Sequence, residues 1–172
     1  WQDPSSRLLT FRGEIGEIKR GALAFEAEMR GLSEKLNRPV GRSYLHVCDA
    51  MLGDRRCGVD TDDALYAGVG AVIAAPDLRT VKASGIAEFE PGWFDNGVLT
   101  WTGGAANGER LGVRSHRTAD GVVTLEFDRD AVLAPQAGDE FKIVAGCDKS
   151  LTACREKFNN IANFQGFPYI PG

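Results

Sequence analysis

Apolar and charged residues alternate along the first part of the chain. In ALAFEAEMR, residues 22–30, one set of alternate positions is apolar and the other carries the charges, which is the pattern of a half-exposed strand. The apolar set is Leu23, Phe25, Ala27 and Met29, and the charged residues are Glu26, Glu28 and Arg30. LLTFRGEIGEIKR, residues 8–20, also alternates, but its parity slips near Gly16, and this slip indicates a β-bulge. The two runs together predict a β-hairpin that turns at Arg20-Gly21.

Short runs with strand character continue through the middle of the chain, and each predicts a β-strand. They are Ala67–Ala75, Thr80–Ala83, Val98–Thr102, Arg110–Arg117, Val122–Phe127 and Glu140–Ala145. Asp120-Gly121 separates two of these runs and favours a two-residue hairpin turn. Short strands joined by glycine-rich links are typical of a small barrel or sandwich, and no βαβ alternation indicates a parallel sheet.

Helical segments are predicted on either side of these strands. A short helix begins at Ser33 and stops before Pro39, because the residue before a proline is biased away from helix. DKSLTACREKF is a second helix, for which Asp148 is the expected N-cap. The last residues, NFQGFPYIPG, are irregular and aromatic. We expect the large side chains of this tail to pack on a surface as a strap: Phe164, Phe167 and Tyr169.

These elements divide the chain into two predicted regions. Residues 1–42 contain the hairpin and a short linker helix, and residues 43–172 form a β-rich domain. Two cysteine-bearing arms, residues 43–66 and 146–172, bracket that domain. The predicted fold class is mainly β with a minor α+β component: a small β-barrel or sandwich with a short helical, cysteine-bearing C-terminal arm.

Length and charge narrow the class of protein. A chain of 172 residues is long enough to bury a core without cross-links. The net charge of −4 argues against a general polyanion binder. No run of about eighteen apolar residues occurs, so we predict no integral membrane segment. The chain begins at Trp1 and WQDPSSRLL has no signal-peptide features, so we interpret the chain as part of a longer product, with nothing that indicates an oxidising compartment.

The cysteines carry the strongest chemical signal in the sequence. They form two pairs, Cys48-x8-Cys57 and Cys147-x6-Cys154, at the entrance and the exit of the β-rich stretch. A β unit that begins and ends at the same edge would bring the two pairs together. Glycines beside the cysteines would let backbone segments approach closely: Gly53, Gly58 and Gly146.

Four interpretations of the cysteines remain open. They could be free thiols with no common role, or disulfides, although nothing in the sequence indicates secretion. A structural zinc site is the third interpretation, but zinc sites usually space paired ligands by about two to four residues. An iron–sulfur cluster is the fourth. It takes four cysteine thiolates and is larger than one ion, so the wider spacing favours it.

Charged residues around the pairs fit an anionic centre. Cations would stabilise the net negative charge of a thiolate-ligated cluster, although the same side chains would also suit a solvated basic face. The basic residues are Arg55, Arg56, Lys149 and Arg155. Asp49 and Asp148 each follow the first cysteine of a pair, and we interpret them as turn or cap residues rather than ligands.

Other side chains give no indication of catalysis. His46 lies two residues before Cys48 and is interpreted as a strand residue rather than a metal ligand. His116 lies between arginines and is expected to face solvent. With two histidines in the chain and no legible nucleophile–base arrangement, the sequence does not predict an enzyme.

Three segments resemble a known family. GCDKSLTACREKFNNIANFQGFPYIPG, PVGRSYLHVCDAMLGDRRCGVD and EPGWFDNGVLTWT are similar to the C-terminal region of the hub, or tail-tip, proteins of long-tailed phages and of the gene transfer agents of alphaproteobacteria. The lambda tail-tip protein is a more distant relative. GEIGEIKRGALAFEAEMRGL is a softer match, and the resemblance covers Trp1 to Gly172.

The resemblance implies a mostly β fold with barrel-like hub domains, in which residues 1–42 end an upstream hub domain. It implies a homotrimer at the distal end of a tail tube. It also implies a 4Fe-4S cluster, with zinc as the alternative. By this likeness the cofactor-binding and metal-ligating residues are Cys48, Cys57, Cys147 and Cys154.

The expected function is therefore structural. The protein would close the tail tube of a virion, seat the distal tail protein and other baseplate or tail-fibre proteins, and open for DNA ejection. The particle would be assembled in the bacterial cytoplasm, and DNA would touch the hub only in passage. Two alternatives are an iron–sulfur electron-transfer protein, for which no flavin, nicotinamide or haem site is recognisable, and a zinc-stabilised nucleic-acid-binding module.

Overall fold

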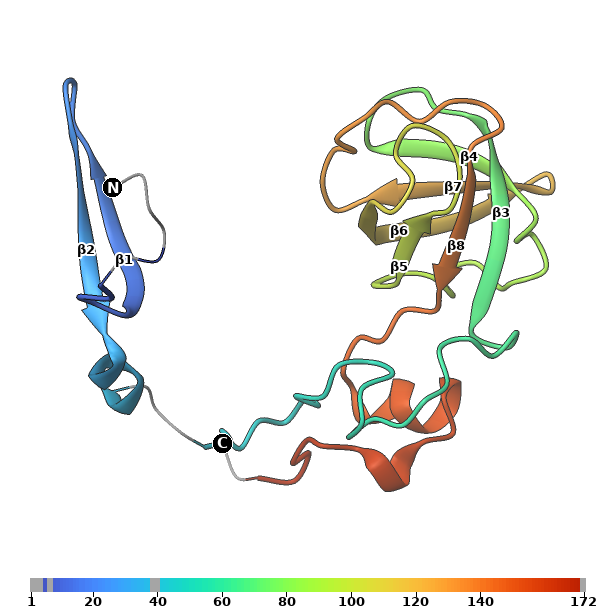
Figure 1. The fold of residues 1–172 in the computed structure, drawn as a ribbon. Helices are drawn as coiled ribbons and strands as arrows, with labels where there is room; N and C mark the ends of the chain where they lie inside the picture. The colour runs from blue at the N-terminus through green and yellow to red at the C-terminus, as the bar shows by residue number, and fades with distance from the viewer. Residues whose placement is uncertain (1–4, 6–7, 38–40, 171–172) are drawn as a thin grey trace. The chain divides into compact units, whose positions relative to one another are not determined.

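The computed structural model describes residues 5, 8–37 and 41–170, which fall into two compact units (Figure 1). The units comprise residues 1–43 and 44–172, and each is described by itself. Trp1, Pro39 and Gly172, on which some of the expectations rest, lie outside the described residues, as does most of WQDPSSRLL. None of the helices in the described ranges has the length and apolar character that crossing a bilayer requires.

The first unit contains the predicted hairpin. Strands β1 (Gly13–Arg20) and β2 (Phe25–Gly31) pair antiparallel, and a register shift between Ile15 and Ile18 confirms the bulge. The turn differs from the prediction. The Gly21 N–H donates to the Ala24 carbonyl oxygen at 2.8 Å, so the turn spans residues 21–24 and β2 starts only at Phe25. The short helix is confirmed as the 3₁₀ helix η2 (Leu32–Asn37).

One face of this hairpin is apolar and exposed. Ile15 pairs with Met29 and Ile18 with Ala27, so these side chains share a face with Phe25. Between 57 and 74% of the surface of Ile15, Ile18, Phe25 and Met29 is accessible. Two paired strands are marginally stable in water unless another element covers their apolar face. The hairpin therefore presents a surface suited to a partner.

In the second unit, the described residues form a closed antiparallel barrel with the strand order β3-β4-β7-β6-β5-β8. The strands are β3 (Ala67–Ala74), β4 (Thr80–Ser84), β5 (Val98–Trp101), β6 (Arg110–Ala119), β7 (Val122–Phe127) and β8 (Glu140–Val144). Each predicted strand is confirmed, with ends that differ by at most two residues. The mainly β class is confirmed as well, and the barrel option is the one the chain adopts.

Alternating side chains fill the interior of the barrel. Trp101 packs edge-on against Phe127 and Phe141, with ring centroids 6.3 and 6.0 Å apart. All three rings are almost fully buried, and with Phe94 they are the largest fully buried side chains among the described residues. The predicted turn at Asp120-Gly121 is confirmed, and both residues have the positive φ angles, 51° and 75°, that a tight two-residue hairpin requires.

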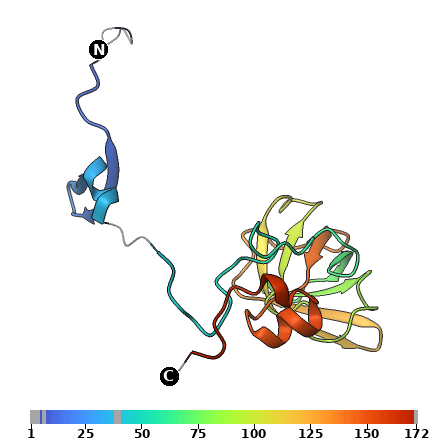
Figure 2. The ribbon, with the colours of Figure 1, turned by 90° about the horizontal axis from the view of Figure 1, so that it is seen from below.

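Barrel closure brings the two cysteine arms to the same end of the barrel. β3, which follows the first arm, pairs with β8, which precedes the second, and Ala67 lies opposite Val144. Beyond the strands, the Ala145 N–H donates to the Tyr66 carbonyl oxygen at 2.7 Å. Figures 1 and 2 show the two arms together beside one end of the barrel. The expectation that the β unit begins and ends at one edge is therefore confirmed.

Gly146 allows the second arm to leave the barrel. A Cβ atom at this position would lie 1.6 Å from the Asp95 carbonyl oxygen, so no other residue fits without a backbone shift. The two glycines of the first arm have positive φ angles, 80° at Gly53 and 70° at Gly58. The predicted close approach of backbone is confirmed at Gly146, whereas the nearest atoms at Gly53 and Gly58 belong to the side chains of Thr61 and Asn163.

The C-terminal tail forms part of the predicted strap. Phe164 and Phe167 are half-buried, and the Phe167 N–H donates to the Leu45 carbonyl oxygen at 2.8 Å. Tyr169 does not follow the prediction, since 87% of its surface is accessible. Its neighbour Pro168 turns its carbonyl oxygen toward His46, and the Tyr169 ring points away into solvent.

Candidate metal centre

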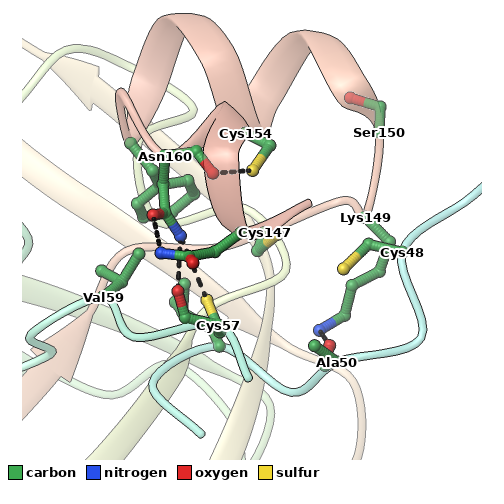
Figure 3. A pocket seen from close by; sticks show the side chains of 12 residues that line it. Cys48, Ala50, Cys57, Val59, Cys147, Lys149, Ser150, Cys154 and Asn160 are labelled. Carbon is green, nitrogen blue, oxygen red and sulfur yellow. Dashed lines mark hydrogen bonds between the residues drawn. The ribbon is translucent and has the colours of Figure 1, made fainter. Parts of the chain in front are cut away.

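All four cysteines line one pocket between the two arms (Figure 3). The cavity between these side chains measures about 20 Å³, roughly the room that one water molecule needs. Each cysteine is half-buried, and all four are free thiols. The remaining lining residues are partly apolar and partly polar: Ala50, Leu52, Val59, Phe158, Lys149, Ser150, Asn160 and Asn163. The structure thus brings Cys48, Cys57, Cys147 and Cys154 together, as their positions in the sequence predicted.

A carboxylate organises the turn that presents Cys57. Asp54 Oδ1 accepts the N–H groups of Cys57 at 2.7 Å and Arg56 at 2.9 Å, and Asp54 Oδ2 accepts the Met51 N–H at 3.0 Å. The hydrogen bond from Cys57 is the main reason why the pKa of Asp54 is lowered. Asp54 therefore holds the backbone of the first arm and leaves the thiol free to face the pocket.

The prediction that Asp148 is the N-cap of the second helical segment is wrong. Its Oδ1 accepts the Ser150 N–H at 2.8 Å, which fixes the turn before the helix. Ser150 makes the capping contact instead, because its Oγ accepts the Ala153 N–H at 3.0 Å. The helix then continues as the π-helix η3 (Ala153–Lys157), which carries Cys154. π-turns are rare and frequently occur at functional sites.

Hydrogen bonds join the two arms directly. The Cys48 N–H donates to the Lys149 carbonyl oxygen at 2.8 Å, and the Lys149 ammonium donates to the Ala50 carbonyl oxygen at 2.6 Å. Asn160 forms a second junction, since its side-chain Nδ2 donates to the Cys57 carbonyl oxygen at 2.6 Å. Asn160 was not among the predicted site residues, because nothing in a single sequence marks a contact across 103 residues.

The thiols lie close enough to affect one another electrostatically. Burial raises the pKa of the Cys154 thiol, and the neighbouring thiolates of Cys48, Cys147 and Cys57 raise it further. Four thiolates would therefore repel one another strongly in this pocket. A cation, or a centre that contains cations, would relieve that repulsion.

Lys157 is a half-buried cation near the site, and it was not among the predicted ones. Its ammonium donates to the Trp93 carbonyl oxygen and lies 4.7 Å from the centre of the Trp93 ring. Burial lowers the pKa of Lys157, and the Cys147 thiolate opposes this effect. Of the predicted cations, Lys149 lines the pocket, Arg56 pairs with Asp49 at 3.1 Å, and the Arg55 and Arg155 side chains are exposed.

The two histidines lie outside the pocket. His46 is exposed, and its Nδ1 is 3.4 Å from the Pro168 carbonyl oxygen. His116 was expected in solvent but is fully buried inside the barrel. Flanking arginines suggested exposure, yet the alternation along β6 turns Arg117 outward and His116 inward against Phe94, with ring centroids 5.0 Å apart. Among the described residues, no group of three or more His, Cys, Asp or Glu side chains is arranged around one ion position.

Comparisons with known proteins point to phage particles. Residues 92–172 match a family model described as "Phage conserved hypothetical protein BR0599", and residues 1–60 match one described as "Baseplate hub protein, N-terminal attachment domain". A solved chain described as "Virion of native gene transfer agent (GTA) particle" is 42% identical, with a TM-score of 0.79 over 100% of this chain. The present chain spans 59% of that chain. Among curated proteins, none matches.

Proposed function

Because the chain belongs to the baseplate hub proteins of phage-type particles, we propose that it is a structural component of a virion tail tip whose two cysteine arms are clamped by an iron–sulfur cluster. The role is mechanical and not enzymatic: the hub closes the tail tube, seats its neighbours and opens for DNA. Assembly takes place in the bacterial cytoplasm. The single observation that carries the clamp is the convergence of four thiols from two distant arms on one pocket.

The chemistry of the pocket supports a cluster. Cysteine thiolates are the usual ligands of 4Fe-4S centres, and Cys48, Cys57, Cys147 and Cys154 would supply all four. Phe158 and Val59 form an apolar wall, and Lys157 places a cation near Cys147. The bound group would supply covalent links between the arms, so that metal binding would also stabilise the fold.

Zinc is the alternative occupant of the same thiols. One Zn²⁺ takes four thiolates at about 2.3 Å in a tetrahedral site, so the arms would have to close around a point. A cluster instead spreads its ligands around a larger body, which suits the wide spacing of the cysteines within each pair. An electron-transfer role for the cluster is the other alternative, and reversible reduction in the assembled particle would favour it.

The hub is proposed to act as a homotrimer, with the apolar hairpin face as part of its contact with a second copy of the chain. The exposed face of Ile18 and Phe25 needs a cover, and closed symmetric rings are the common form of such assemblies. The distal tail protein and other baseplate or tail-fibre proteins are the proposed neighbours. Isolated tail tips in which the full-length hub is monomeric would contradict the trimer.

Metal analysis of anaerobically purified protein tests the clamp. We expect a brown protein that absorbs broadly in the visible region and holds about four irons and four acid-labile sulfides per chain, as a 4Fe-4S cluster does. About one zinc per chain and no iron would show that a zinc ion, and not a cluster, joins the two arms. A folded, metal-free protein with four reactive thiols after reconstitution with both metals would overturn the clamp altogether.

A further inference from the structure

We propose that Asn160 is the positioning residue of the cysteine site: it sets the orientation of Cys57 and Cys154 and donates an N–H group toward the Cys57 sulfur. The inference rests on the proposed function, because it assigns this residue a role toward the group that the four thiols would hold. Asn160 lies beyond the helix that carries Cys154, yet it contacts both cysteine arms (Figure 3).

The side-chain amide of Asn160 is fully used. An amide nitrogen has two N–H groups. Nδ2 lies 2.6 Å from the Cys57 carbonyl oxygen and 3.8 Å from Cys57 Sγ, so one N–H can serve each atom. The amide oxygen accepts the Asn163 Nδ2 at 2.7 Å, which fixes the orientation of the amide. The amide therefore presents donors, and not its oxygen, to Cys57.

The backbone of Asn160 contacts Cys154, which lies in the same arm as Asn160. Its N–H donates to the Cys154 carbonyl oxygen at 2.8 Å, and its carbonyl oxygen accepts the Cys154 thiol at 3.2 Å. The preceding residue, Asn159, has a φ of 45°, the left-handed conformation that ends many helices. Because η3 is a π-helix, its turns contain one residue more than those of an α-helix. The last hydrogen bond at this helix end, from the Asn160 N–H, therefore reaches the carbonyl oxygen of Cys154.

Asn160 makes more contacts than the end of a helix requires. The left-handed Asn159 alone reverses the chain, and no helix end requires a side-chain bond to a segment 103 residues away. A donor beside a ligand sulfur stabilises negative charge on that sulfur, and hydrogen bonds to sulfur are among the features that set cluster potentials. Residues that hold metal ligands typically contribute about 10- to 100-fold to metal affinity.

The first experiment uses metal-free, reduced protein, so that it does not depend on any metal. Asn160→Asp keeps the shape of the side chain but has no N–H donors when ionised, and Asn160→Ala removes the side chain. Alkylation of each cysteine is followed by peptide mass mapping. We expect Cys57 to react at least about fivefold more slowly in Asn160→Asp, because the lost donor and the added carboxylate charge both disfavour the thiolate that attacks the reagent, and fivefold is the factor that the net free energy of one hydrogen bond corresponds to. Asn160→Ala, which adds no charge, shows how much of this change comes from the lost donor alone.

Asn107→Asp is the matched control, because it makes the same charge change in an exposed turn of the barrel. It should leave all alkylation rates as in the wild type. Circular dichroism melts identify a variant that has lost its fold. Unchanged Cys57 and Cys154 reactivity in well-folded Asn160 variants would overturn the inference, whatever metal the wild type holds.

The second experiment uses reconstituted protein. Asn160→Asp should release iron to a chelator about tenfold faster or more, and its reduction potential should shift to a more negative value. Asn107→Asp should do neither. A variant with wild-type potential and wild-type iron release would overturn the role toward the sulfur. If the wild type binds neither iron nor zinc while the alkylation result holds, the proposed clamp fails and the positioning of the cysteines stands.

Discussion

Tyr44 and Phe167 meet edge to face, with ring centroids 4.6 Å apart. This contact joins the first residue of the second unit to its C-terminal strap, residues 164–170. A backbone hydrogen bond from Phe167 to Leu45 lies beside it. Because Cys48 follows three residues after Leu45, the strap restrains the segment that leads into the cysteine pocket.

Removal of the Phe167 ring should loosen this segment. Phe167→Ala is expected to destabilise the second unit by about 2 kcal/mol, less than a fully buried phenylalanine, because the ring is half-buried. Hydrogen exchange should speed up in residues 44–48 and 164–170, and the barrel strands should remain protected. Tyr169→Ala serves as the control, since its ring is exposed. Equal effects of the two substitutions would contradict the strap.

Gly146→Ala should be among the most damaging small substitutions in the chain. The added methyl group would lie 1.6 Å from the Asp95 carbonyl oxygen, and the backbone is held there because Ala145 and Gly146 donate their N–H groups to the carbonyl oxygens of Tyr66 and Trp93. We expect a loss of about 3 kcal/mol or more in the free energy of unfolding, measured by urea denaturation. At Gly103 the nearest atom would be 3.5 Å away, so Gly103→Ala should cost far less.

The strands of the barrel were predictable because their signal is local. In Val122–Phe127 every second side chain is buried, and the sequence shows the same alternation. The closure of the barrel could not be predicted from the sequence, because it depends on the pairing of β8 with both β3 and β5, which lie far away in sequence. The grouping of the cysteines was predictable, since it required only that the arms leave the barrel at one edge.

The side chains that surround the cysteines were less predictable. Asn160 and Lys157 act on residues of the other arm or of the barrel, and no periodic pattern marks such contacts. His116 was predicted to face solvent because arginines flank it, but the alternation along β6 places it on the buried face. In each case the deciding fact is which face or which distant backbone atom the residue meets, and only the folded chain provides it.

Buried His116 should make stability depend on pH. Burial lowers the pKa of His116, while Asp95 partly opposes the change and Arg117 and Lys157 add to it. Below the ordinary histidine value of about 6.5 the unfolded chain binds a proton that the folded chain refuses, so stability falls as pH falls. The slope from this group is at most about 1.4 kcal/mol per pH unit, down to its folded pKa.

Urea denaturation between pH 7.5 and about 5 checks this effect. His116→Leu should flatten the dependence in this window, whatever it does to stability at pH 7.5. His46→Gln is the matched control, because His46 is exposed and should leave the slope unchanged. An unaltered slope in His116→Leu would show that other groups cause the acid sensitivity.

Lys157 should stabilise the charge of a bound cluster. Lys157→Gln removes a half-buried cation near Cys147 and keeps most of the side-chain volume over Trp93. We expect a more negative reduction potential, because the reduced cluster carries the extra negative charge that the cation favours. Arg155→Gln removes an exposed charge from the same helix and should have a much smaller effect, since solvent screens it. Equal shifts would contradict a special role for Lys157.

Loss of one thiol should affect folding as well as colour. Cys147→Ser keeps the size of the side chain but removes a ligand, and we expect a colourless protein that assembles poorly. The arms meet across about ninety residues, and closing a loop of that length contributes about 4 kcal/mol on a loop-entropy model. The metal-loaded wild type should therefore melt well above both its metal-free form and Cys147→Ser, and these last two should melt close together.

Arg55→Ala is the control for this comparison, because the Arg55 side chain is exposed near the same pocket. It should keep the colour and shift only the rate of cluster loss. Comparing metal-free proteins separates ligand loss from packing. If Cys147→Ser melts far below the metal-free wild type, the thiol stabilises the fold by packing against Phe158 and its neighbours, and the clamp is not the cause. If the two melt together and the loaded wild type melts higher, the stabilisation comes from the bound centre that joins the arms.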